Sequence, residues 1–173
     1  NGNSLTGSIP SSISQLSNLN FISLSNNELS GPIPNGLGVL PLRGLSLEGN
    51  QLSGEIPADL GNLSFVSFFI VLSDNQLTGA IPANLANLLI NKSEDFSLYL
   101  NKNQLTGEIP ATFDQINTGS VVDLSENKLT GVLSDALATT VTDNNISLLL
   151  THNQFRCPYP SLLEGQFAEN SES

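Results

Sequence analysis

The feature that most constrains this chain is a six-residue sequence that returns at nearly regular intervals. Its clearest copy is Leu-Thr-Gly-Glu-Ile-Pro, from Leu105 to Pro110. Similar copies begin at Leu5, Leu29, Leu52 and Leu77, and weaker ones at Leu129 and Phe155. A short sequence that repeats at this period is typical of a solenoid, in which each coil buries its apolar edge only against its neighbours. We therefore expect a stack of coils.

An asparagine stands two residues before each copy. These residues are Asn3, Asn27, Asn50, Asn75, Asn103, Asn127 and Asn153, at intervals of 24, 23, 25, 28, 24 and 26 residues. An asparagine side chain can satisfy backbone groups at a bend that lacks a strand partner. We therefore predict a structural asparagine ladder along the stack. The 28-residue interval contains an insertion at residues 89–95, which is expected to form a surface loop.

The second coil is complete and shows how each coil is expected to be built. Ile22 and Leu24 alternate with outward-facing positions, which is the pattern of a short strand. One strand per coil predicts a parallel sheet with strands about 4.8 Å apart. The last apolar residues of the strands are expected to form one buried column: Leu24, Leu47, Leu72, Leu100, Leu124 and Leu150. Residues 11–19 and 35–40 are expected to form short helical or 3-10 turns.

The line L-x-x-L-x-L-x-x-N-x-L-(S/T)-G-x-I-P resembles the plant-type leucine-rich repeat of receptor-like kinase ectodomains, receptor-like proteins and polygalacturonase-inhibiting proteins. The resemblance covers Asn3 to Pro160. It implies an α/β solenoid: a right-handed superhelix with a concave parallel β-sheet, short helical or 3-10 turns on the convex side, and a second extended segment at each G-x-I-P. We expect a partial first coil and about six full coils in residues 1–160. Residues 161–173 are expected to form a C-terminal cap or frayed tail, and the chain looks like a fragment of a longer protein.

The composition excludes several classes of partner. A net charge of −11 argues against nucleic acid and anionic membranes, which require clustered Lys and Arg. The sequence holds no run of 18 apolar residues, so we expect no membrane span in this chain. We also expect no cofactor, since the scaffold shows no motif for one.

Three glycosylation triplets and one cysteine bear on the location of the protein. The triplets begin at Asn62, Asn91 and Asn145, of which Asn91 is the best candidate because it lies in the expected loop. They agree with the extracellular or cell-surface location that the resemblance implies. Cys157 is expected to be either a buried free thiol or half of a cap disulfide whose partner lies outside this chain, since terminal caps of the family often pair cysteines.

Alternation along the strands predicts which residues face solvent on the concave sheet. In the fourth to sixth coils they form an apolar and aromatic cluster, which we predict to be the partner-binding surface. Its members are Phe68, Phe69, Val71, Phe96, Tyr99, Val121 and Asp123. The alternative is that the fourth coil shifts its register by one residue and buries its phenylalanines.

A second row, one residue before each marker asparagine, carries most of the charge near the sheet: Asn26, Gly49, Asp74, Lys102, Glu126 and His152. A catalytic interpretation would pair Glu126 with His152. Because no nucleophile converges on that pair and a lone histidine has no partner ligands for a metal, we interpret the row as a surface charge ladder. We expect no enzyme activity, no catalytic residues and no metal site.

These features favour a non-catalytic domain that binds a protein, peptide or carbohydrate ligand through the concave face. One alternative is a structural subunit that packs into a larger assembly through an open N-terminal edge. A minor alternative is an ice-binding protein, because the third residue after each asparagine forms a hydroxyl row: Thr6, Ser30, Ser53, Thr78, Thr106 and Thr130.

Overall fold

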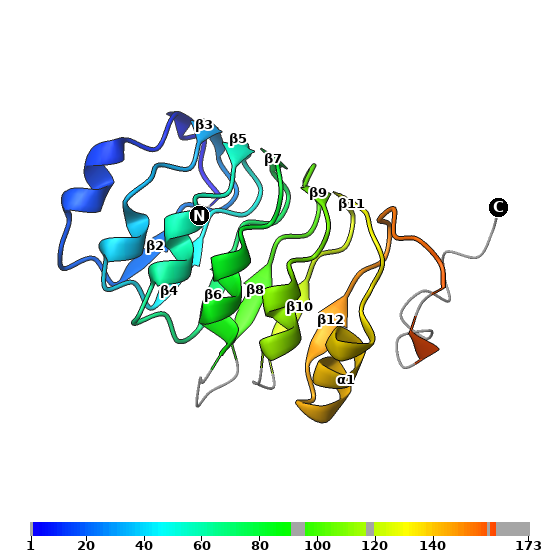
Figure 1. Ribbon diagram of the computed structural model, residues 1–173. Coiled ribbons are helices and arrows are strands. Elements are labelled where there is room, and N and C mark those ends of the chain that lie inside the picture. Colours follow the sequence, from blue (N-terminus) through cyan, green and yellow to red (C-terminus); the bar gives the residue numbers. More distant parts are fainter. Residues whose placement is uncertain (1, 91–95, 117–119, 159, 162–173) are drawn as a thin grey trace.

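The chain forms a stack of coils, as the repeat predicts. We describe its computed structural model over residues 2–90, 96–116, 120–158 and 160–161. Figure 1 shows the coils side by side in chain order, with the helices along one side of the stack. The prediction of an α/β leucine-rich-repeat solenoid is confirmed.

Each complete coil contributes one strand to a six-stranded parallel sheet. In chain order these strands are β2 (Phe21–Ser23), β4 (Gly44–Ser46), β6 (Phe69–Val71), β8 (Ser97–Tyr99), β10 (Val121–Asp123) and β12 (Ser147–Leu149). Neighbouring strands pair at equivalent positions of the repeat, so Phe69 lies beside both Gly44 and Ser97. Residues at the same place in successive coils therefore form straight rows across the sheet.

The repeated six-residue sequence forms a second line of parallel strands (Figure 1). These are β1 (Thr6–Gly7), β3 (Glu28–Pro32), β5 (Gln51–Glu55) and β7 (Gln76–Thr78), followed by the pair β9 (Thr106–Gly107) and β11 (Lys128–Leu129). Here the pairing is shifted by two residues relative to the repeat, because Ser30 lies beside Gln51 and Ser53 lies beside Gln76. A single bridge between Ala80 and Thr106 joins the two parts.

Short helices return the chain along the opposite side. They are the 3-10 helices η1 (Ser11–Gln15), η2 (Leu37–Val39), η3 (Ala58–Asn62), η4 (Ala83–Leu89) and η5 (Ala111–Gln115), and the α-helix α1 (Asp135–Asp143). Helices pack about 8–10 Å apart, whereas paired strands are about 4.8 Å apart. The stack therefore bends with the six-stranded sheet on its inner side, and we call this sheet the concave sheet.

Side chains from all coils share one continuous core. In the column of strand leucines, Leu47, Leu72, Leu100, Leu124 and Leu150 are at most 1% exposed. Leu24 is only half-buried, so the prediction is wrong for that residue. It directly follows β2, which ends the sheet, and no further strand covers it in the described structure.

The asparagine ladder is confirmed where its hydrogen bonds are described. The Oδ1 atom of Asn50 accepts a hydrogen bond from the Leu29 backbone N–H at 3.1 Å. Its Nδ2 atom donates to the carbonyl oxygens of Leu24, Leu47 and Glu48. Asn75, Asn103, Asn127 and Asn153 make the same kind of contacts. Each side chain thus ties its own bend to the preceding coil.

Cys157 corrects one expectation. Its side chain is exposed and free, so the prediction of a buried thiol is wrong. An exposed thiol agrees with the other prediction, a partner cysteine outside this chain, which stays a prediction. Most of the expected C-terminal tail lies outside the described residues.

Candidate functional site

The concave sheet presents two straight rows of outward-facing residues. The first row consists of Phe21, Gly44, Phe69, Ser97, Val121 and Ser147, and the second of Ser23, Ser46, Val71, Tyr99, Asp123 and Leu149. Adjacent members of a row are direct partners across the sheet, about 4.8 Å apart. The side chains differ from coil to coil, unlike the leucines beneath them. The rows therefore form a continuous surface of varied chemistry.

Most residues of the predicted binding surface lie on or beside these rows. Phe68 is exposed, and five others are half-buried with their outer faces accessible: Phe69, Val71, Tyr99, Val121 and Asp123. The strands of the fourth to sixth coils bring these five together, because Val71, Tyr99 and Asp123 are consecutive partners in one row. Phe69 and Val121 flank Ser97 in the other row.

Phe96 is a correction, because its side chain is 1% exposed and belongs to the core. In the third coil the buried residue before the strand, Leu42, stands eight positions before the marker asparagine. In the fifth coil Phe96 stands only seven positions before Asn103 and takes that buried role. Its backbone N–H donates to the Oγ atom of Ser120 at 3.1 Å in the next coil.

The alternative of a shifted register in the fourth coil is wrong. Ile70 and Leu72 are fully buried. Phe69, which precedes Ile70, and Val71, which lies between the two buried residues, face outward. The alternation of β6 is therefore the one that the repeat predicts. Phe68 and Phe69 remain part of the surface.

Sequence reasoning missed the contribution of Phe21. The Phe21 and Phe68 rings stack with centroids 5.9 Å apart and planes at 22°, although the two residues come from coils that are not neighbours. They meet because the intervening coil carries Gly44, where a Cβ atom would lie 2.9 Å from the Phe69 ring and 3.1 Å from the Phe21 ring. We call Phe21, Phe68 and Phe69 the phenylalanine cluster. A glycine between two phenylalanines in one row is the signal that could have revealed it.

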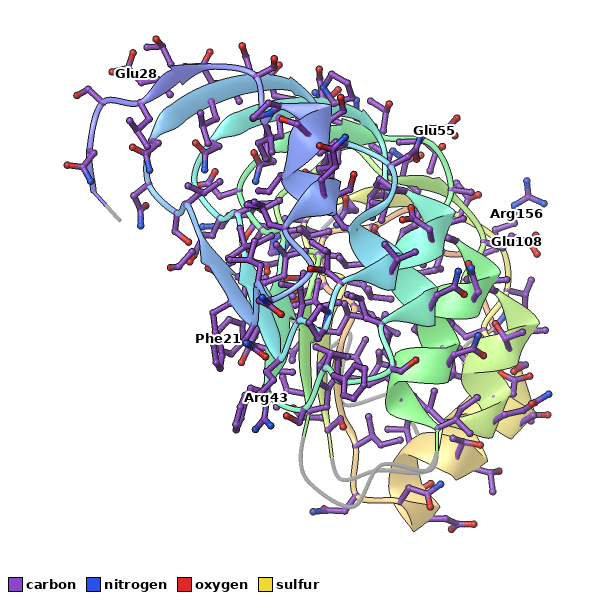
Figure 2. The ribbon with its side chains drawn as sticks, turned by 90° about the vertical axis from the view of Figure 1, so that its left-hand side faces the viewer. Phe21, Glu28, Arg43, Glu55, Glu108 and Arg156 are labelled. Carbon is purple, nitrogen blue, oxygen red and sulfur yellow. The ribbon has the colours of Figure 1, made fainter. Side chains whose placement is uncertain are left out.

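Charged groups flank this surface. Arg43 is exposed and lies on the same side of the molecule as Phe21 (Figure 2). Its backbone carbonyl accepts hydrogen bonds from the N–H groups of Ser67 and Phe68, which places Phe68 against the start of β4. Farther along, Asp123 Oδ1 accepts hydrogen bonds from the backbone N–H and the hydroxyl of Ser125, at 3.0 and 2.6 Å. These bonds hold the carboxylate in one orientation on the sheet.

The row interpreted as a charge ladder has a backbone role as well. Asn26, Asp74, Lys102, Glu126 and His152 all have φ between 52° and 56°, and Gly49 has φ 65°. This left-handed conformation turns the chain sharply at the end of each strand. Glu126 and His152 occupy neighbouring coils and are both exposed. Within the described ranges, no group of three potential ligands could hold a metal ion.

The hydroxyl row lies on the second line of strands, and its members are exposed or half-buried. Because that pairing is shifted by two residues, equivalent hydroxyls are not direct partners. Ser53 lies between Pro32 and Gln76, and Thr78 lies beside Glu55. Glu55 and Glu108 project from the side of the molecule opposite Phe21 and Arg43 (Figure 2). The row is thus interrupted by larger and charged side chains.

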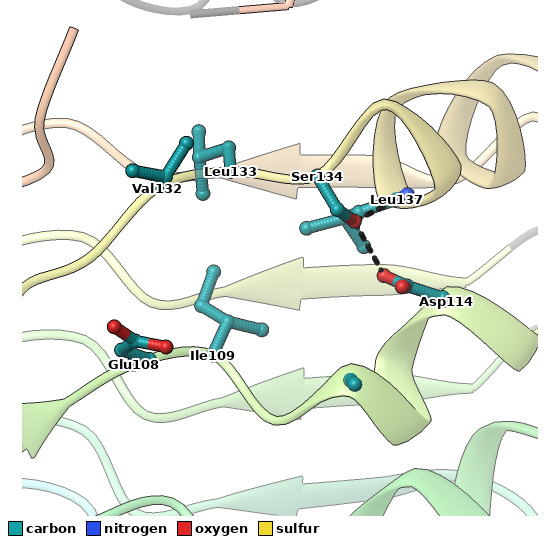
Figure 3. A pocket seen from close by; sticks show the side chains of 8 residues that line it. Glu108, Ile109, Asp114, Val132, Leu133, Ser134 and Leu137 are labelled. Atoms are coloured by element: carbon teal, nitrogen blue, oxygen red, sulfur yellow. Dashed lines mark hydrogen bonds between the residues drawn. The ribbon is translucent and has the colours of Figure 1, made fainter.

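A small cavity of about 210 Å³ separates the fifth and sixth coils at the G-x-I-P edge. Figure 3 shows it beside Ser134, the residue that replaces the proline of the repeat. The Ser134 hydroxyl donates to Asp114 Oδ1 at 2.9 Å and accepts from the Leu137 backbone N–H at 3.0 Å. The Ser134 hydroxyl and the Asp114 carboxylate therefore stabilise the start of α1. The cavity lies at the G-x-I-P edge and does not extend the binding surface.

Two of the three glycosylation triplets can be placed. Asn62 is exposed at the end of η3. Asn145 is also exposed and has φ 51° just before β12. Asn91 lies outside the described residues. Across the part of the chain that the structure describes, no helix is both long and apolar enough to cross a membrane.

Comparison with solved structures finds plant receptors. The leucine-rich-repeat ectodomain of the Arabidopsis thaliana receptor kinase GASSHO1/SCHENGEN3, in complex with Casparian strip integrity factor 2, is 31% identical with a TM-score of 0.76. The Arabidopsis receptor kinase HAESA, in complex with the peptide hormone IDA and the co-receptor SERK1, is 32% identical with a TM-score of 0.75. The chain is covered to 89% and 95% in these matches, and the other proteins to 18% and 27%.

A plant ice-binding protein is similar to the same degree. It is 32% identical with a TM-score of 0.75, and the match covers 87% of this chain and 47% of that protein. The chain thus spans less than half the length of each of these three structures. No curated protein sequence matches significantly.

The repeats themselves match a family model. The model described as Leucine Rich Repeat matches residues 18–40, 41–63, 69–88 and 96–116, about half of the chain. These segments hold the strand leucines and marker asparagines of four successive coils, and the observed core and ladder are built from the same residues. The chain belongs to the leucine-rich repeat family.

Proposed function

We propose that this domain is a non-catalytic binding module that recognises a protein or peptide ligand on the concave sheet. The binding surface consists of Val71, Tyr99, Val121 and Asp123 together with the phenylalanine cluster. This surface differs from the one expected from the sequence in two residues: Phe96 is left out and Phe21 is added. An extracellular location accords with this function, because similar structures are receptor ectodomains.

The observation that carries the proposal is the row Val71, Tyr99 and Asp123. These three residues are direct partners on successive strands, yet they are apolar, aromatic and acidic in turn. The fold requires only that these positions face outward, since the aliphatic residues on either side of them fill the core. Variation at such positions can specify a partner without harming the scaffold.

The chemistry of the surface indicates the kind of ligand. Half-exposed aromatic rings can act as anchors for apolar side chains of a ligand. Asp123 presents an oriented carboxylate, and Asp74 and Glu126 are exposed at the strand ends nearby. A peptide with an apolar anchor and a basic side chain would complement these groups. A carbohydrate ring can also stack on these aromatic side chains, so oligosaccharides are the second probe.

The test uses two probes: a displayed library of random peptides and a panel of neutral oligosaccharides. Each probe is selected on the wild-type protein and then measured against the double variant Phe69→Ser, Tyr99→Ser. We expect enrichment of peptides with an apolar and a basic residue, and a loss of binding of roughly tenfold or more in the double variant. Its unfolding midpoint should stay close to that of the wild type.

The matched control is Val132→Ser, which removes an exposed apolar side chain from the G-x-I-P edge. It should bind the selected peptides normally. Normal binding by the double variant would refute the proposal. Enrichment of oligosaccharides alone would refute a peptide ligand but keep the surface.

The hydroxyl row and the likeness to a plant ice-binding protein favour ice binding as a second candidate. The hydroxyl row is less regular in the structure than in the sequence. Equivalent hydroxyls on neighbouring strands are displaced by about 6.6 Å along the strand as well as about 4.8 Å between strands. Thermal hysteresis of the purified protein tests this directly. If hysteresis is found, Thr78→Val with Thr106→Val should reduce it, whereas the phenylalanine-cluster variants should not.

A further inference from the structure

Arg43 is held directly before β4, between the segments that carry the stacked Phe21 and Phe68 rings. Its backbone N–H donates to the carbonyl oxygen of Asn20, the residue before Phe21, at 2.7 Å. Its own carbonyl oxygen accepts from the Phe68 N–H at 3.2 Å. The third coil, which carries Arg43, has a described coil on either side, so these are the contacts of a residue inside the stack. The side chain is exposed on the same side of the molecule as Phe21 (Figure 2).

Among the described residues, no hydrogen bond or ion pair engages the Arg43 guanidinium group. Arg43 is also the one charged side chain in the segments that lead into β2, β4 and β6, residues 16–20, 40–43 and 63–68. These segments present apolar surface around it, since Phe65 is 64% exposed and Phe68 is 44% exposed. A guanidinium group in such surroundings suits a carboxylate of a ligand, because its planar fork binds both oxygens while the rings exclude water.

The opposite ends of the same strands carry negative charge. Glu48 and Asp74 are exposed after β4 and β6, and Glu126 is exposed after β10. Asp123 adds an oriented carboxylate within β10. In the four-residue segments that follow β4, β6, β8 and β10, only Lys102 is basic. The concave sheet is therefore positive at Arg43, where a strand begins, and mainly negative where the strands end.

From this arrangement we propose that the concave sheet selects a peptide with a carboxylate and a basic group at opposite ends, and that Arg43 binds the carboxylate. The inference rests on the proposed function and adds a direction to it. The acidic end of the peptide lies beside the phenylalanine cluster, the apolar anchor lies on Val71 and Tyr99, and the basic end lies by Asp123. A peptide bound in the reverse direction brings like charges together at both ends, which disfavours it.

The register of the sheet sets the distance that the ligand spans. Arg43 precedes Gly44, which is aligned through β6 and β8 with Val121. Asp123 therefore lies three strands away and three residues farther along the strand direction. With the usual spacings of a parallel sheet, the two backbone positions are about 17 Å apart. An extended peptide covers that distance in about five residues.

Parallel peptide selection on the wild type and on Arg43→Gln tests the proposal, with a random library displayed with free C-termini. We expect the wild type to enrich peptides with a carboxylate about five residues from a basic residue. Selection on Arg43→Gln should keep the apolar and basic residues and lose the preference for a carboxylate. A synthetic peptide selected on the wild type should bind Arg43→Gln roughly tenfold more weakly. Amidating its C-terminus, or replacing its acidic side chain by the amide, identifies which carboxylate Arg43 binds.

The matched control is Arg156→Gln, which removes the same charge from an exposed arginine on the side of the molecule opposite Arg43 (Figure 2). It should bind the synthetic peptide normally. Full affinity of Arg43→Gln, or an equal preference for carboxylates on both proteins, overturns the inference and leaves the proposed function standing. If binding is instead insensitive to Phe69→Ser with Tyr99→Ser, the proposed function fails and this inference fails with it.

Discussion

At the scale of single residues, two kinds of position hold each coil in shape. Strand leucines fill the core, and marker asparagines connect each bend to the previous coil. The residue before each asparagine adopts φ near 55°, whatever its side chain. The last requirement is purely one of backbone conformation, which is why residues as different as Lys102 and His152 occupy the same place.

The buried leucine column can be tested at Leu100, which is fully buried between Leu72 and Leu124. We expect Leu100→Ala to lower the free energy of unfolding by about 2–5 kcal/mol, because a close-packed core cannot collapse fully around the void. Chemical denaturation measures the loss. Leu24→Ala is the matched control and should cost clearly less, since Leu24 is only half-buried. Equal losses for the two variants would show that the column is not packed as described.

In the row whose residues have the left-handed backbone conformation, a substitution is expected to raise the free energy of unfolding. Lys102 has φ 54°, a conformation that glycine adopts without steric strain. We expect Lys102→Gly to stabilise the protein by about 0.5–1 kcal/mol, less the entropic cost of the added glycine. Lys128→Gly, in strand β11, should destabilise it instead, because a glycine weakens a strand. Thermal unfolding of both variants decides the matter, and a destabilised Lys102→Gly protein would contradict this account.

At the scale of elements, the convex layer depends on close contacts between successive 3-10 helices. Gly61 in η3 is buried against η4, and a Cβ atom there would lie 2.3 Å from the Asn84 carbonyl oxygen. A Cβ atom on Gly38 in η2 would lie closer still, 1.9 Å from the backbone carbonyl oxygen of Asp59 in η3, whose Oδ2 atom accepts hydrogen bonds from the N–H groups of Gly36 and Gly38. These contacts hold neighbouring helices of the first coils close together.

We therefore expect Gly61→Ala to destabilise the protein by about 1–3 kcal/mol, the usual effect of overpacking a dense region. The neighbouring substitution Asn62→Ala removes an exposed side chain and should change stability by less than about 0.5 kcal/mol. The two unfolding midpoints provide the comparison. A neutral Gly61→Ala variant would mean that η3 and η4 can move apart freely.

At the scale of the whole molecule, charge is distributed unevenly along the stack. The first 47 residues are neutral and the remainder carries a side-chain charge of −11. Self-repulsion of that magnitude destabilises a compact state and is screened by salt. We expect the unfolding midpoint to rise when sodium chloride is raised from about 0.01 M to about 0.5 M, where the Debye length has become much shorter. A midpoint that falls under these conditions would show that attractive ion pairs dominate instead.

The sequence by itself determined the architecture. A motif repeated in every coil specifies the same leucine column, asparagine ladder and strand direction each time, so local pattern and global fold agree. For the same reason, alternation along the strands was sufficient to place Phe69, Val71, Tyr99, Val121 and Asp123 on the outer face. Neighbouring coils carry the same repeat, so these features follow from the repeat alone.

Only the tertiary structure decided features that depend on how one coil meets the next. Phe96 is buried and Phe68 is exposed although both stand seven positions before their marker asparagines, a difference that the period alone does not reveal. Phe21 stacks on Phe68 across an intervening coil that carries Gly44, where a Cβ atom would crowd the Phe21 and Phe69 rings. The hydroxyl row loses its regularity through a two-residue shift in strand pairing. Each of these features depends on packing and register between coils, and a repeat motif defines those only approximately.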